Sequence, residues 1–135
     1  MHRAWPALLL VGMLACQTPH YATDQLRNST IREHVFLPAM RADAHYSGQV
    51  VNRCEDLLIH LCFDIEAEEV TEAAQLYPLV HHTITEMNKQ LIDFEREGIM
   101  LDSTARVALA AEFTFIANAY GIAADEQELM RPAAW

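Results

Sequence analysis

Positive charge is scarce in this sequence. Lysine and arginine together number 9 against 19 aspartate and glutamate residues, Lys89 is the one lysine, and the formal net charge is −10 at pH 7. Proteins that bind nucleic acid neutralise runs of phosphates with clustered basic side chains. We therefore expect no nucleic-acid binding, and anionic lipid head groups would repel the body of the protein. A basic protein partner would be attracted.

Nucleophiles are also few. The three serines, Ser29, Ser47 and Ser103, each lie where a helix is expected to begin, and helix capping explains all three. Cys54 and Cys62 are eight residues apart in one expected helix, about 12 Å, which a disulfide does not span. They lie on its apolar face, so we expect buried, unreactive thiols, with an intermolecular disulfide as the alternative. No cofactor motif occurs, and the sequence favours a protein that is not an enzyme and holds no metal or cofactor.

Strand patterns and hairpin dipeptides are absent, and three of the four glycines, Gly48, Gly98 and Gly121, lie at expected helix boundaries. Between residues 50 and 66, apolar residues recur at intervals of three and four, which predicts an amphipathic helix. The stripe consists of Val50, Cys54, Leu57, Leu58, Leu61, Cys62 and Ile65. We predict an all-α fold, a small helical bundle of about four helices plus a short C-terminal helix.

The clearest helical signal comes next. Six apolar residues are spaced alternately by three and four, as in the seam of a bundle: Tyr77, Val80, Ile84, Met87, Leu91 and Phe94. Ile84 and Leu91, in the middle of the run, are expected to be buried. Because Pro78 has no N–H group, we place the start of regular helical hydrogen bonding near Gln75. Gly98 is suited to the left-handed conformation that ends a helix.

Three further helices complete the expected bundle. Residues 103–120 are apolar nearly all round, which predicts a helix in the middle of the bundle or beneath a partner. Its Arg106 is expected to form an ion pair with Asp102, four residues earlier. A short last helix follows Asp125, a suitable cap. Near the start, "TIRE" at residues 30–33 has the spacing of a capping box, and a short helix is expected through residues 34–42.

The first fifteen residues have the layout of an export signal. His2 and Arg3 precede an apolar run at 4–14, which is shorter than the about 20 residues needed to span a bilayer. The sequence "MLA" followed by Cys16 resembles the lipobox of bacterial lipoproteins, in which that cysteine is lipidated and becomes the new N-terminus. By the same resemblance, Gln17 favours the outer membrane. An ordinary cleaved signal and a retained first helix are the alternatives.

These features divide the chain into three parts. We expect a signal peptide of the lipoprotein type at 1–15, a flexible polar tether at 16–29 and a single helical domain at 30–135. The protein would then lie on the periplasmic side of the cell envelope, attached to the membrane through its lipid anchor only.

Four residues are the candidates for a binding site. His82 and Glu86 have the one-turn spacing that two ligands on a helix need, and His81 adjoins the seam. Arg106 is a cation on an otherwise apolar helix and must find a partner. No second pair completes a metal site, so an ordinary surface pair is favoured for His82 and Glu86, a hydrogen-bonded histidine for His81 and a structural ion pair for Arg106.

Several stretches together resemble a small, mostly bacterial family, the domain-of-unknown-function family 5713. The resemblance runs from about His34 to Trp135. It rests on "LCFDIEAE" from Leu61, "LYPLVHHTITEMN" from Leu76, "AR" at 105–106, "AEFTFIANAYG" from 111 and the terminal tryptophan. The resemblance implies a small helical domain with no established activity, and it supplies no active-site residue.

Two functions from different classes follow. The first is a lipid-anchored helical module that binds a protein partner, one form being an immunity protein that neutralises a secreted toxin. The second is a small histidine- or metal-dependent enzyme built around His81, His82, Glu86 and Arg106. A structural envelope component and a homodimer also stay open. The acidic composition and the lack of nucleophiles favour the binding module.

Overall fold

The computed structural model describes residues 22–135, and this part of the chain consists of helices joined by turns and loops, without strands. In chain order the helices are η1 (Thr23–Gln25), α2 (Ser29–Arg32), α3 (Pro38–Ala42), α4 (Gly48–Ala67), α5 (Ala73–Arg96), α6 (Ser103–Ala119) and α7 (Glu126–Met130). The predicted all-α bundle with a short C-terminal helix is confirmed. The expected signal peptide, Cys16 and the first part of the expected tether lie outside the described residues.

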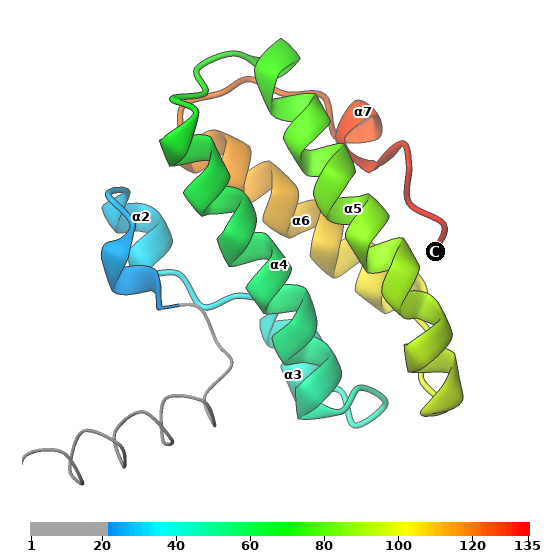
Figure 1. The fold of residues 1–135 in the computed structure, drawn as a ribbon. Helices are drawn as coiled ribbons and strands as arrows, with labels where there is room; N and C mark the ends of the chain where they lie inside the picture. The colour runs from blue at the N-terminus through cyan, green and yellow to red at the C-terminus, as the bar shows by residue number, and fades with distance from the viewer. Residues whose placement is uncertain (1–21) are drawn as a thin grey trace, which may run out of the picture.

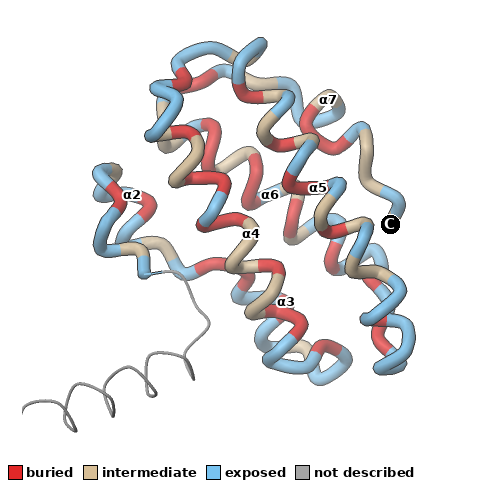
Figure 2. The backbone as a smooth tube through the Cα atoms, in the orientation of Figure 1, coloured by how far each residue is buried: buried red, intermediate tan, exposed pale blue. Residues whose placement is uncertain are grey.

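The three long helices form the body of the bundle (Figure 1). Helices α4 and α5 lie side by side and run in opposite directions, with α6 behind them. Helix α7 packs against α5 and α6, α2 packs against α6, and α3 packs against both α4 and α6. The buried positions gather where these helices face one another (Figure 2). Within residues 22–135, no helix combines the length and apolar character that crossing a bilayer requires.

Helix α4 confirms the stripe expected from the sequence except at Leu57, which is only partly buried. Ser47 caps the helix by accepting a hydrogen bond from the Val50 N–H group at 3.2 Å. The buried residues are Val50, Val51, Cys54, Leu58, Ile59, Leu61, Cys62 and Ile65. Both cysteines are free and buried, and burial, the main cause, raises the pKa of each thiol to about 12. They are therefore packing residues with no thiolate at neutral pH.

Helix α5 begins earlier than expected, at Ala73 rather than near Gln75. Glu72 and Gln75 form a capping box in which each side chain accepts from the other's backbone N–H group, and this fixes the start despite Pro78. Val80, Ile84, Met87 and Phe94 of the seam are buried as predicted, whereas Tyr77 and Leu91 are only partly buried. The expectation of a buried Leu91 was wrong, because its side chain lines a surface hollow beside Met100 and Trp135.

Helix α6 also differs from what the sequence predicts. Its cap is Asp102, which accepts from the N–H groups of Thr104 and Ala105 and from the hydroxyl of Tyr46. The predicted ion pair between Asp102 and Arg106 is wrong, since Arg106 donates instead to the backbone carbonyl of Trp135, 2.5 Å away. The apolar surface of α6 is also not fully covered, because Val107 is 70% exposed.

The segment before α4 forms two short helices rather than one. Asn28, not Thr30, caps α2 by accepting from the Ile31 N–H group, so the expected capping box is wrong. Leu37 then adopts a left-handed conformation, with φ of 56°, and Pro38 opens α3. Leu26, within the segment expected to be a tether, is only 2% exposed. The packed domain thus begins at least four residues before residue 30.

Candidate functional site

The four residues singled out in the sequence do not converge on one site. The ring of His81 bonds the backbone carbonyl of Glu128 at 2.6 Å, and Arg106 bonds that of Trp135. Both therefore hold the C-terminal segment against the bundle. His82 and Glu86 line a groove between α4 and α5, where Glu86 lies 2.7 Å from the ammonium group of Lys89.

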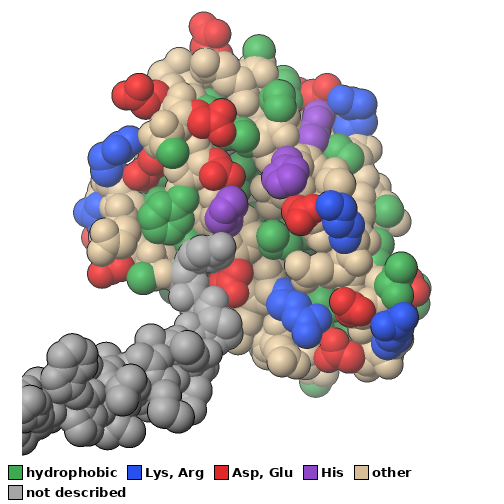
Figure 3. Space-filling view, viewed as in Figure 1, with side chains coloured by type: hydrophobic (Ala, Val, Ile, Leu, Met, Phe, Trp, Pro, Cys, Tyr) green, Lys and Arg blue, Asp and Glu red, His purple; other side chains and the backbone are tan. Residues whose placement is uncertain are grey.

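Polar side chains make up most of the lining of the groove between α4 and α5. Histidine side chains gather near the middle of this face, among acidic and basic neighbours (Figure 3). The groove is lined by Arg53, Asp56, Leu57, His60, His82, Thr83, Glu86 and Gln90. Within residues 22–135, no cluster of three or more histidine, cysteine and acidic side chains is arranged to hold a metal ion. The hydrogen bond and charge of Lys89 hold the pKa of Glu86 below its ordinary value, as an ion pair does.

A different pocket, between α3 and α6, has the features of a binding site. Its volume is about 480 Å³, within the range of ligand pockets. The lining is almost wholly apolar and includes Leu37, Pro38, Ala39, Val107, Ala108, Ala111 and Phe115, with Thr104, His34 and Glu112 as its polar members. A concave apolar surface with a few convergent polar groups is the usual form of a site that orients a ligand.

Glu112 is the buried polar centre of this pocket. Its side chain is only 6% exposed. One oxygen, Oε1, lies 2.7 Å from His34 Nε2, and the other, Oε2, accepts from the Leu37 N–H group at 2.5 Å. The His34 ring stacks on Phe115, with centroids 3.8 Å apart. Both carboxylate oxygens are thus used, and the histidine at the wall of the pocket is held in place.

The backbone before α3 is shaped by this carboxylate. Leu37 is completely buried, and a leucine with positive φ is strained. The hydrogen bond from its N–H group to Glu112 holds the left-handed residue and so directs the chain into Pro38 and α3. Strained backbone of this kind persists only where surrounding contacts fix it, and it often accompanies binding sites.

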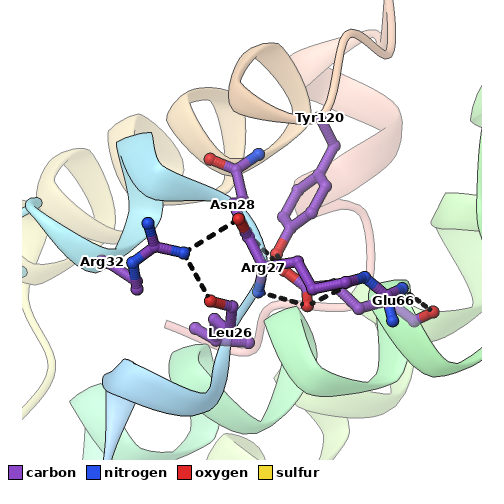
Figure 4. Close-up of polar contacts among 6 residues, drawn as sticks. All are labelled: Leu26, Arg27, Asn28, Arg32, Glu66 and Tyr120. Carbon is purple, nitrogen blue, oxygen red and sulfur yellow. Dashed lines mark hydrogen bonds and ion pairs between the residues drawn. The ribbon is translucent and has the colours of Figure 1, made fainter.

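A second glutamate, Glu66 near the end of α4, is the centre of a polar cluster (Figure 4). It accepts from the N–H groups of Arg27 and Asn28, at 2.7 and 3.1 Å, and from the hydroxyl of Tyr120 at 2.7 Å. The Asn28 side chain also donates to the carbonyl of Ala119. The cluster fastens the start of the domain to the ends of α4 and α6.

The hydrogen bonds control the ionisation of this cluster. Burial alone would raise the pKa of Glu66, but the donors Arg27 N–H, Tyr120 hydroxyl and Asn28 N–H outweigh it and hold the pKa below its ordinary value. Burial and then the bond to Glu66 raise the pKa of Tyr120. Glu66 therefore stays a carboxylate and Tyr120 a phenol at neutral pH.

The sequence contains one signal for the α3–α6 pocket. Glu112 is a charged residue in a helix that is otherwise nearly all apolar, and a buried charge requires partners. Those partners, His34 and the backbone of Leu37, lie 78 and 75 residues earlier in the chain. No local spacing connects them.

The fold and the pocket define the class: a small all-α bundle domain with an apolar pocket built around the buried Glu112 and its partner His34. The chain belongs to the family of unknown function DUF5713, whose model matches residues 30–135. No curated protein and no solved structure matches the chain.

Proposed function

We propose that this protein is a small binding module whose α3–α6 pocket receives an apolar side chain of a basic protein partner. The observation that carries the proposal is the pocket itself: an apolar hollow of about 480 Å³ beside the buried Glu112 and its partner His34. Apolar anchors inserted into such hollows supply most of the binding energy at many interfaces.

Charge supports a basic partner. The chain carries 19 acidic against 9 basic residues, and an acidic surface accelerates the encounter with a positively charged protein. Val107 supports a macromolecular occupant, because this apolar side chain lines the pocket and is 70% exposed. A partner that covers the pocket would bury Val107 as well.

The expected lipid anchor at Cys16 is part of the same proposal. Lipidation of Cys16 would hold the domain on the periplasmic side of the cell envelope, where it would meet a secreted or periplasmic partner. In a bacterial host, the full chain is expected to incorporate labelled fatty acid, and Cys16→Ser to abolish the label. Equal labelling of both forms would show that "GMLAC" is not a lipidation signal.

Site-specific photo-crosslinking tests the docking site. A photo-reactive amino acid at position 107 should form an adduct with a basic protein, whereas the same group at position 92, where Ile92 is 62% exposed outside the pocket, should not. Ala111→Trp, which fills the pocket from an exposed position, should remove the adduct. Equal adducts at both positions, or none at 107, would contradict the proposal.

A further inference from the structure

His34 leaves one hydrogen-bonding atom of the pocket unused. Its Nε2 atom is engaged by Glu112, and its ring is fixed by stacking on Phe115 and by an edge contact with Phe36, whose centroid is 4.7 Å away. No residue in 22–135 is hydrogen-bonded to the other ring nitrogen, Nδ1. Nδ1 is therefore the atom that His34 can offer to a ligand.

The partner of Nε2 determines what Nδ1 can do. An ionised carboxylate only accepts hydrogen bonds, so Nε2 carries the hydrogen and donates it to Glu112 Oε1. In a neutral imidazole the remaining nitrogen then has no hydrogen and is an acceptor. The pocket thus combines an apolar lining with the Nδ1 acceptor of His34 and the hydroxyl of Thr104.

Resting on the function proposed above, we infer that the side chain received by this pocket is the indole of a tryptophan. Indole is planar and apolar, and it carries one N–H donor at its edge, which can donate to the acceptor Nδ1. Val107, Ala108 and Phe115 offer apolar surface to the ring. An ammonium group would lose its hydration in this lining, and both oxygens of Glu112, the charged acceptor there, are already engaged by His34 and the Leu37 N–H group.

Two probes of nearly equal size test the inference on the full-length protein. The first is 3-methylindole, and the second is 1,3-dimethylindole, which lacks the N–H group. Titration calorimetry should show tighter binding of 3-methylindole by about three- to tenfold, the worth of one net hydrogen bond. His34→Phe, which keeps an aromatic ring against Phe115, should bind both probes equally. His45→Phe, outside the pocket, should keep the preference.

Each result has one meaning. A preference for 3-methylindole that disappears in His34→Phe supports the indole assignment. Equal affinities for the two probes in the unmodified protein overturn the indole assignment. The proposal that the pocket receives an apolar side chain is then tested separately by the crosslink at position 107. Absence of binding by either probe also overturns it, and the crosslink then decides the proposed function separately. If His34→Phe does not fold, as seen by circular dichroism, the comparison of the two probes on the unmodified protein still decides.

Discussion

Glu66 and Glu112 fasten two irregular N-terminal segments to the bundle by the same means. Each accepts backbone N–H groups just before a short helix: Glu66 from the residues that precede α2, and Glu112 from Leu37, which precedes α3. Their side chains are similarly buried, with 10% and 6% exposed. The two carboxylates therefore do equivalent structural work.

Their surroundings differ. The hollow beside Glu66, about 400 Å³, has a mixed lining, in which the polar residues Arg27, Glu69 and Thr71 lie beside Ile65 and Val70. Tyr120 supplies a third donor to the carboxylate. The hollow beside Glu112 is apolar. A buried carboxylate is thus not by itself evidence of a binding site. Whether such a site binds a partner depends on the surface that adjoins the carboxylate. Covering apolar surface is favourable in free energy, whereas covering hydrated polar surface is not.

Removal of Glu112 should have the largest effect on stability. Glu112→Ala leaves the buried Leu37 N–H group without its acceptor and His34 without its partner, and it should lower the free energy of unfolding by about 3 kcal/mol. Urea denaturation measures the change. Glu112→Gln, which keeps one acceptor, should lose less. A loss below about 1 kcal/mol for Glu112→Ala would mean that the carboxylate does not hold the α3 segment.

Removal of Glu66 should have a smaller effect. The N–H groups of Arg27 and Asn28 lie near the surface, where water can replace the carboxylate, so Glu66→Ala should lower the free energy of unfolding by about 1 to 2 kcal/mol. The same denaturation experiment applies. If Glu66→Ala lowered the free energy of unfolding more than Glu112→Ala does, the expected order of the hydrated Glu66 site and the apolar Glu112 site would be reversed.

The Glu66 contribution should also depend on pH. Because the folded-state pKa is lowered, the stabilisation is present above the unfolded-state pKa of about 4.3 and is lost as the pH falls through the folded-state pKa. The difference in stability between the parent protein and Glu66→Gln should therefore shrink between pH 7 and pH 3. If this difference in stability instead grew on acidification, folding would raise the pKa of Glu66 rather than lower it.

The smallest effect is expected at the edge of the Glu66 cluster. The Arg27 side chain is 74% exposed, and its Nε atom lies 3.8 Å from Glu66. Exposed ion pairs of this kind contribute little, so Arg27→Ala should change the free energy of unfolding by about 0.5 kcal/mol or less. Thermal unfolding at two salt concentrations measures it. A large loss would show that the side chain, rather than the backbone of Arg27, carries the cluster.

The parts of the fold that follow from local periodicity could be predicted. The stripe of α4, most of the α5 seam and the left-handed Gly98 and Gly121 depend on residues a few positions apart. The helix caps could not be predicted where several residues were candidates. Asn28 and Asp102 acquire their roles from tertiary partners such as Ala119 and Tyr46. The pocket depends wholly on a contact between residues 34 and 112.

The candidate binding residues show the same limit. His82 and Glu86 were correctly placed on one helix face, yet the groove that they line has mostly polar side chains. Arg106 was expected to need a partner and has one, but it is the Trp135 carbonyl rather than a neighbour on its own helix. Spacing predicts which residues share a face, and only the packed chain shows what adjoins that face.

The central claim is that a partner's apolar anchor binds beside Glu112 and not beside Glu66. The most direct measurement is an NMR titration of the full-length protein with a short lysine-flanked peptide that carries one tryptophan. The methyl signals of Ala108 and Ala111 in the α3–α6 pocket should shift, that of Val70 beside Glu66 should not, and Ala111→Trp should abolish the shift of Ala108. Shifts at Val70 that equal those at Ala108, or unchanged signals at Ala108 and Ala111, would contradict the account.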